Sequence, residues 1–212
     1  RGVNMSAEHL RVIIVLYSSA LLPLLLIPLL SYKKIIPAWS LKVYGATFIV
    51  CALGWELWFT YGLVLGDAVD DRRAVILSEM IPIHINWLLN SLADAGSITL
   101  GALLVTWLTF SRNGDIFRQW HWGAFIVLLV LFMGQNIFVE MFLYHDQLAE
   151  GKSLSWAPLA PTGPWYNPTL FEFNGRTITL HGQVPWLIMT PALYGCLIMY
   201  LKRHHPLTNP LQ

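Results

Sequence analysis

Long runs of apolar residues, separated by short polar segments, fill most of the 212-residue chain. Five runs are long enough to be membrane-spanning helices, at about 10–31, 42–65, 83–110, 119–145 and 181–201. A hydrocarbon core of roughly 30 Å takes about 20 helical residues. The first run is too long for a secretory signal, and Lys33 and Lys34 follow it rather than small residues. The pattern predicts an all-α, polytopic membrane protein, a single-domain bundle of five transmembrane helices over 1–212.

The segment 146–180 is the one long connection between these runs. It is rich in Pro, Trp and Gly, and apolar and polar residues alternate around Asn174-Gly175 in its second part. An Asn-Gly pair in such a setting is a strong hairpin signal, because a type I′ turn needs positive φ at both central positions. We expect a small β-hairpin here, in a lid over one face of the bundle. A flexible linker is the alternative, but disordered linkers carry few aromatic residues.

Composition supports a membrane protein and argues against a nucleic-acid partner. Hydrophobic residues make up 56% of the chain and charged residues 12%, whereas soluble domains keep about 25% of their residues charged. The formal net charge is +1, so the sequence has no basic stripe for phosphates. Membrane lipids are the expected surroundings, and a homo-oligomer or a larger membrane complex is a further possible assembly.

The positions of the basic residues indicate the orientation. Lys and Arg are denser near helix ends on the side that holds the first and third connections and the C-terminus, a bias typical of the cytoplasmic side. We therefore expect a cytoplasmic C-terminus, with the N-terminus and the 146–180 segment outside. The lack of an obvious C-terminal retrieval motif favours a bacterial inner membrane over the endoplasmic reticulum.

Three of the twelve acidic residues fall inside apolar runs: Glu56, Asp94 and Glu140. A charge at this depth costs at least about 2.5 kcal/mol, so an intramembrane acid indicates a functional site. Amide side chains accompany the acids at helical spacing or open the fifth run, at Asn90, Gln135, Asn136 and Gln183. We expect these polar stripes to converge on one pocket that opens toward the hairpin. Ordinary interhelical hydrogen bonding is the alternative, and it explains the amides better than the acids.

Aromatic residues near the acids point to a particular chemistry. Trp55 precedes Glu56, and Trp186 follows Gln183 by three residues. A protonated carboxyl group can deliver a proton to an alkene, and aromatic faces stabilise the resulting cation. Apolar surroundings favour the protonated donor, whereas hydrogen bonds favour an ionised acceptor, so neighbouring carboxyl groups can take different roles.

The order of these motifs resembles the emopamil-binding protein family, the membrane sterol isomerases of the EXPERA group. The matching positions are Gly54-Trp55-Glu56, Asp94, Gly134-Gln135 with Glu140, and Gln183-x-x-Trp186. The resemblance implies five helices whose acids surround a sterol. Ala52 replaces the family's His before the second-helix acid, Gln183 replaces an Asn, and the 146–180 loop has no counterpart. The Trp-Glu pair is also similar to that of integral-membrane terpene cyclases.

These observations predict an integral-membrane enzyme for acid/base isomerisation or cyclisation of an apolar sterol- or terpenoid-like lipid, without a cofactor. The expected catalytic residues are Glu56, Asp94 and Glu140, and the expected substrate-binding residues are Trp55, Asn90, Gln135, Asn136, Gln183 and Trp186. Two other functions stay open. One is a non-catalytic accessory subunit of a membrane complex. The other is a metal-binding membrane protein, in which His84, His145, Asp146 and His181 meet at one membrane face and hold Zn or Cu.

Overall fold

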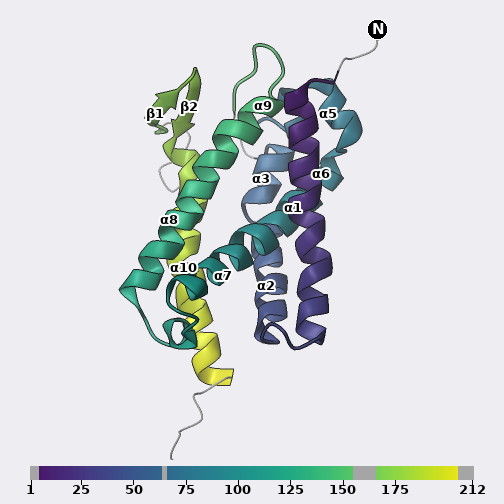
Figure 1. Ribbon diagram of the computed structural model, residues 1–212. Coiled ribbons are helices and arrows are strands. Elements are labelled where there is room, and N and C mark those ends of the chain that lie inside the picture. The colour runs from purple at the N-terminus through teal and green to yellow at the C-terminus, as the bar shows by residue number, and fades with distance from the viewer. Residues whose placement is uncertain (1–4, 64–65, 155–165, 205–212) are drawn as a thin grey trace, which may run out of the picture.

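A computed structural model describes residues 5–63, 66–154 and 166–204 of the chain (Figure 1). The structure is mostly helical, with one two-stranded sheet. The long elements are α1 (Ala7–Tyr32), α2 (Trp39–Leu53), α6 (Ile83–Ala93), α7 (Gly101–Thr109), α8 (Trp122–Val139) and α10 (Leu180–His204). The shorter helices are α3 (Trp55–Tyr61), α4 (Val69–Arg72), α5 (Val75–Met80), the 3₁₀ turn η2 (Gly114–Phe117) and α9 (His145–Gln147). Two π-helical segments, η1 (Asp94–Leu100) and η3 (Glu140–Tyr144), continue α6 and α8.

The structure confirms a mostly helical fold with four to five helical stretches that are long and apolar enough to cross a membrane. Within the described residues, four helical stretches are long and apolar enough to cross a membrane: Ala7–Tyr32, Ile83–Thr109, Trp122–Gln147 and Leu180–His204. The second predicted run, 42–65, is not one straight helix. It forms α2 and α3, which are bent by 45° at Gly54, and the pair makes a fifth span if it is counted as one.

The bend depends on Gly54. Its backbone (φ −92°, ψ −121°) leaves the helical region, and a Cβ atom at this position would lie 2.5 Å from the carbonyl oxygen of Val50. The indole Nε1 of Trp87 donates a hydrogen bond of 2.8 Å to the carbonyl of Ala52, just before the bend. A neighbouring helix therefore helps to satisfy the backbone where the helix is interrupted.

All three acid-bearing spans leave regular α-helical geometry at or next to their acid. The π-helical segments begin at Asp94 and at Glu140, and the bend at Gly54 lies two residues before Glu56. Single π-helical turns inside α-helices are frequent at functional sites. Within the first of these segments, the Ser97 hydroxyl donates a hydrogen bond to the carbonyl of Ser19 on α1 and does not line the pocket.

The predicted hairpin is confirmed. Strands β1 (Thr169–Phe173) and β2 (Arg176–Thr179) pair in antiparallel fashion, with Phe173 opposite Arg176. Asn174 (φ 50°) and Gly175 (φ 72°) both have the positive φ that a type I′ turn requires. Residues 155–165 of the expected lid lie outside the described residues.

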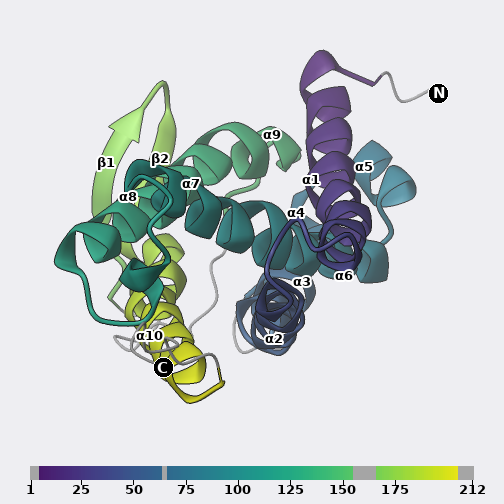
Figure 2. The ribbon, with the colours of Figure 1, turned by 60° about the horizontal axis from the view of Figure 1, so that its bottom comes forward.

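The bundle has two apolar cores, one on each side. The first lies around α8 and α10 and includes Leu128, Phe132 and Tyr194, while the second lies around α1 and α6 and includes Val12 and Leu89. Figure 2 shows α1 with α6 on one side, α8 with α10 on the other, and α7 between them. The polar groups of the spans gather between these two cores.

Candidate functional site

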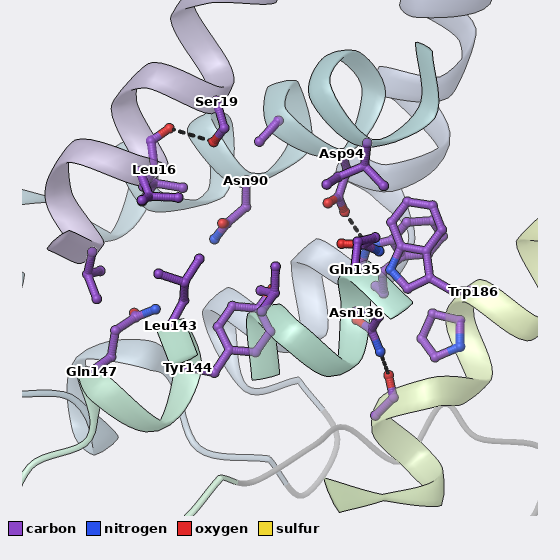
Figure 3. Close-up of a pocket in the computed structure, with 18 residues that line it drawn as sticks. Leu16, Ser19, Asn90, Asp94, Gln135, Asn136, Leu143, Tyr144, Gln147 and Trp186 are labelled. Carbon is purple, nitrogen blue, oxygen red and sulfur yellow. Dashed lines mark hydrogen bonds between the residues drawn. The ribbon is translucent and has the colours of Figure 1, made fainter. Parts of the chain in front are cut away.

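A pocket of about 110 Å³ lies between the two halves of the bundle, among α1, α3, α6–η1, α8–η3 and α10 (Figure 3). Six of the nine expected site residues line it: Trp55, Asn90, Asp94, Gln135, Asn136 and Trp186. These residues come from four of the predicted apolar runs. The structure therefore brings most of the expected binding residues together in one cavity.

Asp94 is the carboxyl group of this pocket. Its Oδ2 accepts a hydrogen bond of 2.7 Å from the indole Nε1 of Trp55. The Trp55 ring lies 5.3 Å from the ring of Trp186, between centroids, and Trp186 in turn stacks on Phe132 at 4.9 Å. The indole N–H fixes one oxygen of this carboxyl group, and the other oxygen can carry the proton that is transferred beside the stacked aromatic rings.

Glu140 lies behind the pocket wall, fully buried between η3 and α10. Gln183 Nε2 donates to Glu140 Oε2 at 2.7 Å, and Asn136 Nδ2 donates to Gln183 Oε1 at 2.8 Å. Gly182 allows this contact, because a Cβ there would lie 2.6 Å from Glu140 Oε2. Asn136 both lines the pocket and binds Gln183, so it connects the pocket to the buried acid.

Glu56 also lies outside the pocket, and a polar chain leads from it toward the hairpin end of the bundle. Its carboxyl group is hydrogen-bonded to Thr60, and Thr60 Oγ1 accepts from Asn86 Nδ2 at 3.3 Å. Asn86 Oδ1 accepts from Arg73 at 3.1 Å, and Arg73 donates to the partly exposed Asp70 at 2.6 Å. The Glu56 side chain therefore faces this chain while its neighbour Trp55 faces the pocket, as the 100° step between successive helical residues allows.

The structure thus departs from the expectation that the three acids converge on one pocket. Among the residues that line it, Asp94 is the only carboxylic acid, whereas Glu56, Glu140 and Gln183 do not line it. Glu56 still interacts electrostatically with Asp94. The two glutamates form a second layer around the pocket.

Several residues that line the pocket were not among the nine expected site residues. Tyr144 lines the pocket, and its ring lies 4.4 Å from that of Phe59. Its position one turn after Glu140 was the available signal. Ser19 and the apolar residues of α1 carry no such signal, because the first apolar run contains no acidic residue.

Arginine side chains connect several elements at the hairpin end of the bundle. The carboxylate of Asp146 accepts hydrogen bonds from Arg11 on α1 and, at 2.5 Å, from Arg176 on β2. Arg72 is buried and donates to the carbonyl of Phe59. Burial lowers the pKa of the Arg72 guanidinium to about 10, an effect that nearby Tyr144 and Glu56 oppose, so Arg72 is charged at neutral pH.

The histidines do not form a ligand set. His84 Nδ1 lies 2.9 Å from the hydroxyl of Tyr61, and His145 Nε2 lies 3.3 Å from the carbonyl oxygen of Thr177. The Asp146 carboxylate is held by two arginines. Nowhere in residues 5–63, 66–154 and 166–204 are three His, Cys, Asp or Glu side chains placed to hold a metal ion, and His181 joins no such group.

No protein-family model, curated protein or solved structure matches the chain. The arrangement of Asp94, the indoles and the amides therefore carries the functional argument.

Proposed function

We propose that the chain is an integral-membrane enzyme that binds an apolar sterol- or terpenoid-like lipid and isomerises or cyclises it by proton transfer. The observation that carries this proposal is Asp94, a carboxyl group that lines a pocket inside an apolar span beside Trp55 and Trp186. Such an acid is costly at this depth and is expected to have a function. The resemblance to the sterol isomerases at Trp55, Asp94 and Trp186 adds support.

Asp94 acts as the acid in this mechanism. Its protonated carboxyl group transfers a proton to one carbon of an alkene, so the π electrons form a C–H bond and leave a carbocation on the other carbon. The Asp94 carboxylate then takes a proton from a carbon next to the cation, and the electrons of that C–H bond form the shifted double bond. In a cyclisation, a second alkene of the same molecule attacks the cation before the proton is lost.

The surrounding residues stabilise and position the reacting groups. Aromatic rings within about 6 Å of a cation contribute roughly 0.5–2 kcal/mol, which suits Trp55 and Trp186 to the cationic intermediate. Asn90 and Gln135 orient the substrate from the pocket wall. Glu56 and Glu140 act as positioning residues, since Glu56 interacts with Asp94 and Glu140 holds Gln183.

The size of the pocket favours a slender substrate. Sites for drug-sized ligands have volumes of about 300–1,000 Å³, whereas this pocket has about 110 Å³. The helices must separate before a lipid is fully enclosed. A flexible isoprenoid chain requires less separation than a rigid fused-ring sterol, so a terpenoid is the better candidate.

The test is deuterium transfer from solvent into lipid. The protein in liposomes is incubated in D₂O with sterol and terpenoid alkenes and with lipids extracted from host membranes, and the products are analysed by mass spectrometry. We expect Asp94→Asn to lower deuterium incorporation by about 10²–10⁴-fold, the usual contribution of a general acid. Asp115→Asn changes an acid of η2 that does not line the pocket and is the matched control.

Two results would contradict the enzymatic proposal. One is incorporation that is equal in Asp94→Asn and the unmodified protein, and the other is no incorporation in either. The accessory-subunit function would then be favoured, and co-purification of partner chains with the full-length protein would test it.

A further inference from the structure

We propose that the ligand reaches the pocket sideways from the bilayer, through a mouth between α1 and α8, with α1 as the wall that moves. This inference rests on the proposed function only in taking the ligand to be dissolved in the membrane. It assigns a role to α1, which carries none of the expected site residues.

The mouth is defined by residues that line the pocket and are accessible from outside. Val15 is the one exposed residue of the lining, with 36% of its surface accessible, and Ser19 is half-buried one turn later. Gln135 and Val139 on α8 are also half-buried. Figure 3 shows Leu16 and Ser19 of α1 on one side of the pocket and Leu143 and Tyr144 of η3 on the other.

The rim of the mouth carries no charged residue. Ile14 and Phe138, beside the mouth on the two helices, are 56% and 58% exposed. The rim itself consists of Val15, Ser19, Gln135 and Val139. A rim without charge does not attract an anionic headgroup, so the occupant that it fits is the hydrocarbon chain of a neutral lipid.

Gln147 lines the pocket toward the hairpin end of the bundle, where several hydrogen bonds join neighbouring segments. Gln147 is buried there, and its carbonyl accepts a hydrogen bond of 2.8 Å from the amide of Ala74. The next residue but one, Ala149, donates to the carbonyl of Arg72 at 2.9 Å. Beside them, the Asp146 carboxylate joins Arg11 to Arg176. These contacts lie on the side toward which we expected the pocket to open.

α1 is the least buried of the long helical stretches, although it packs against α6 and η1. Only 17% of its most apolar stretch is buried within the protein, against 28% for the stretch in Trp122–Gln147 and 56% for the stretch in Ile83–Thr109. Its polar ties are few and include Arg11 to Asp146, Tyr17 to the carbonyl of Met80, and Ser97 to the carbonyl of Ser19. Lipid tails are as apolar as leucine, so a helix that separates in a bilayer loses little hydrophobic stabilisation. Separation of α1 from α8 would widen a pocket that is too small for a lipid.

The first experiment asks which phase the mouth faces. The full chain with Cys196→Ser and Ser19→Cys carries a nitroxide spin label in phosphatidylcholine liposomes. Collision rates are measured with oxygen, which concentrates in the bilayer, and with Ni-EDDA, which stays in water. Labels at Leu25→Cys and Lys152→Cys give the lipid and water references. We expect the label at 19 to match the lipid reference; a match to the water reference would overturn the proposal. If the Ser19→Cys variant does not fold, a spin label at Val139→Cys on α8 tests the same question with the same two references.

The second experiment blocks the mouth. A bimane fluorophore at Asn90→Cys inside the pocket is quenched by doxyl-labelled methyl stearate dissolved in the bilayer. We expect Val15→Trp to reduce this quenching and Ile14→Trp, one residue away on the lipid-facing surface, to leave it unchanged. Equal quenching in the two variants would contradict lateral access. Neither the collision rates nor the bimane quenching depends on turnover. Lateral access can therefore fail while deuterium transfer persists, and deuterium transfer can be absent while lateral access is confirmed.

Discussion

The carboxyl group of Glu140 occupies space that a side chain at position 182 would need. We expect Gly182→Ala to destabilise the protein by about 1–3 kcal/mol, the usual cost of forcing a methyl group into a packed interior. The new Cβ would lie 2.6 Å from Glu140 Oε2. Thermal unfolding of the purified protein in detergent measures the change.

Gly195→Ala is the matched control on the same helix. Apart from the neighbouring backbone of its own helix, no atom lies within 4 Å of a Cβ built at Gly195. Alanine is better than glycine in a helix by about 1 kcal/mol, so this variant is expected to be at least as stable as the unmodified protein. Equal unfolding temperatures for Gly182→Ala and Gly195→Ala would contradict the close packing of Glu140 against α10.

The hydrogen bond from Trp55 to Asp94 is a second residue-scale feature with a testable effect. Trp55→Phe keeps an aromatic ring but removes the Nε1 donor. We expect slower deuterium transfer and a loss of about 1–3 kcal/mol in unfolding free energy, the cost of an unsatisfied buried polar group. Trp58→Phe, which changes a ring outside the pocket lining, is the control. If deuterium transfer drops equally in both variants, the loss comes from the smaller aromatic ring and not from the missing hydrogen bond to Asp94.

The residue types of the site could be predicted from the sequence, but their directions could not. Intramembrane polarity identified Asp94, Asn90 and Asn136 correctly as pocket residues. The same criterion cannot tell that Glu140 turns toward Gly182 or that Glu56 turns toward Thr60. Those directions depend on interruptions of the helices that hydropathy does not report.

At the scale of elements, Gly54 decides how α3 follows α2. We expect Gly54→Ala to destabilise the protein and to displace Trp55, because its Cβ would lie 2.5 Å from the Val50 carbonyl oxygen. The thermal midpoint measures the first effect, and the fall in deuterium transfer measures the second. Gly45→Ala in α2 places its Cβ in open space and should lower neither the thermal midpoint nor deuterium transfer. Normal transfer in Gly54→Ala would show that the bend does not position the site.

Hydropathy predicted the helical stretches well because membrane spans must satisfy their backbone internally. The first, third, fourth and fifth runs match helical stretches to within a few residues, and the Asn174-Gly175 turn forms as expected. The bend at Gly54 and the π-helical segments at Asp94 and Glu140 could not be predicted. They depend on contacts between helices, such as the bond from Trp87 to Ala52.

At the scale of the whole molecule, the orientation in the membrane stays a prediction. The density of Lys and Arg predicts that Lys152, near the hairpin, lies outside and that Gln119, before α8, lies in the cytoplasm. In a Cys196→Ser background, we expect a membrane-impermeant maleimide to label Lys152→Cys in intact cells and Gln119→Cys only after the membrane is opened. Labelling of Gln119→Cys in intact cells, with Lys152→Cys protected, would reverse the orientation.

The Asp146 contacts connect parts of the chain that are far apart in sequence. Arg11 comes from α1 and Arg176 from β2, and both donate to a carboxylate whose side chain is 1% exposed. The first helix, the end of the fourth span and the hairpin therefore behave as one unit at this end of the molecule. At the other end of the bundle, where α1 ends and α8 begins, no carboxylate in the described structure joins the two helices by ion pairs. The two halves of the bundle can therefore separate more easily at that end.

The indoles of Trp55 and Trp186 give the pocket an optical property. Their rings lie 5.3 Å apart with planes tilted by 53°, close enough for their excited states to couple. A fixed tilt makes such a pair chiral, so it contributes a couplet to the near-ultraviolet circular dichroism of the protein. If a ligand contacts these rings and changes their tilt, we expect the couplet to change, so the protein would report its own occupancy without any attached label.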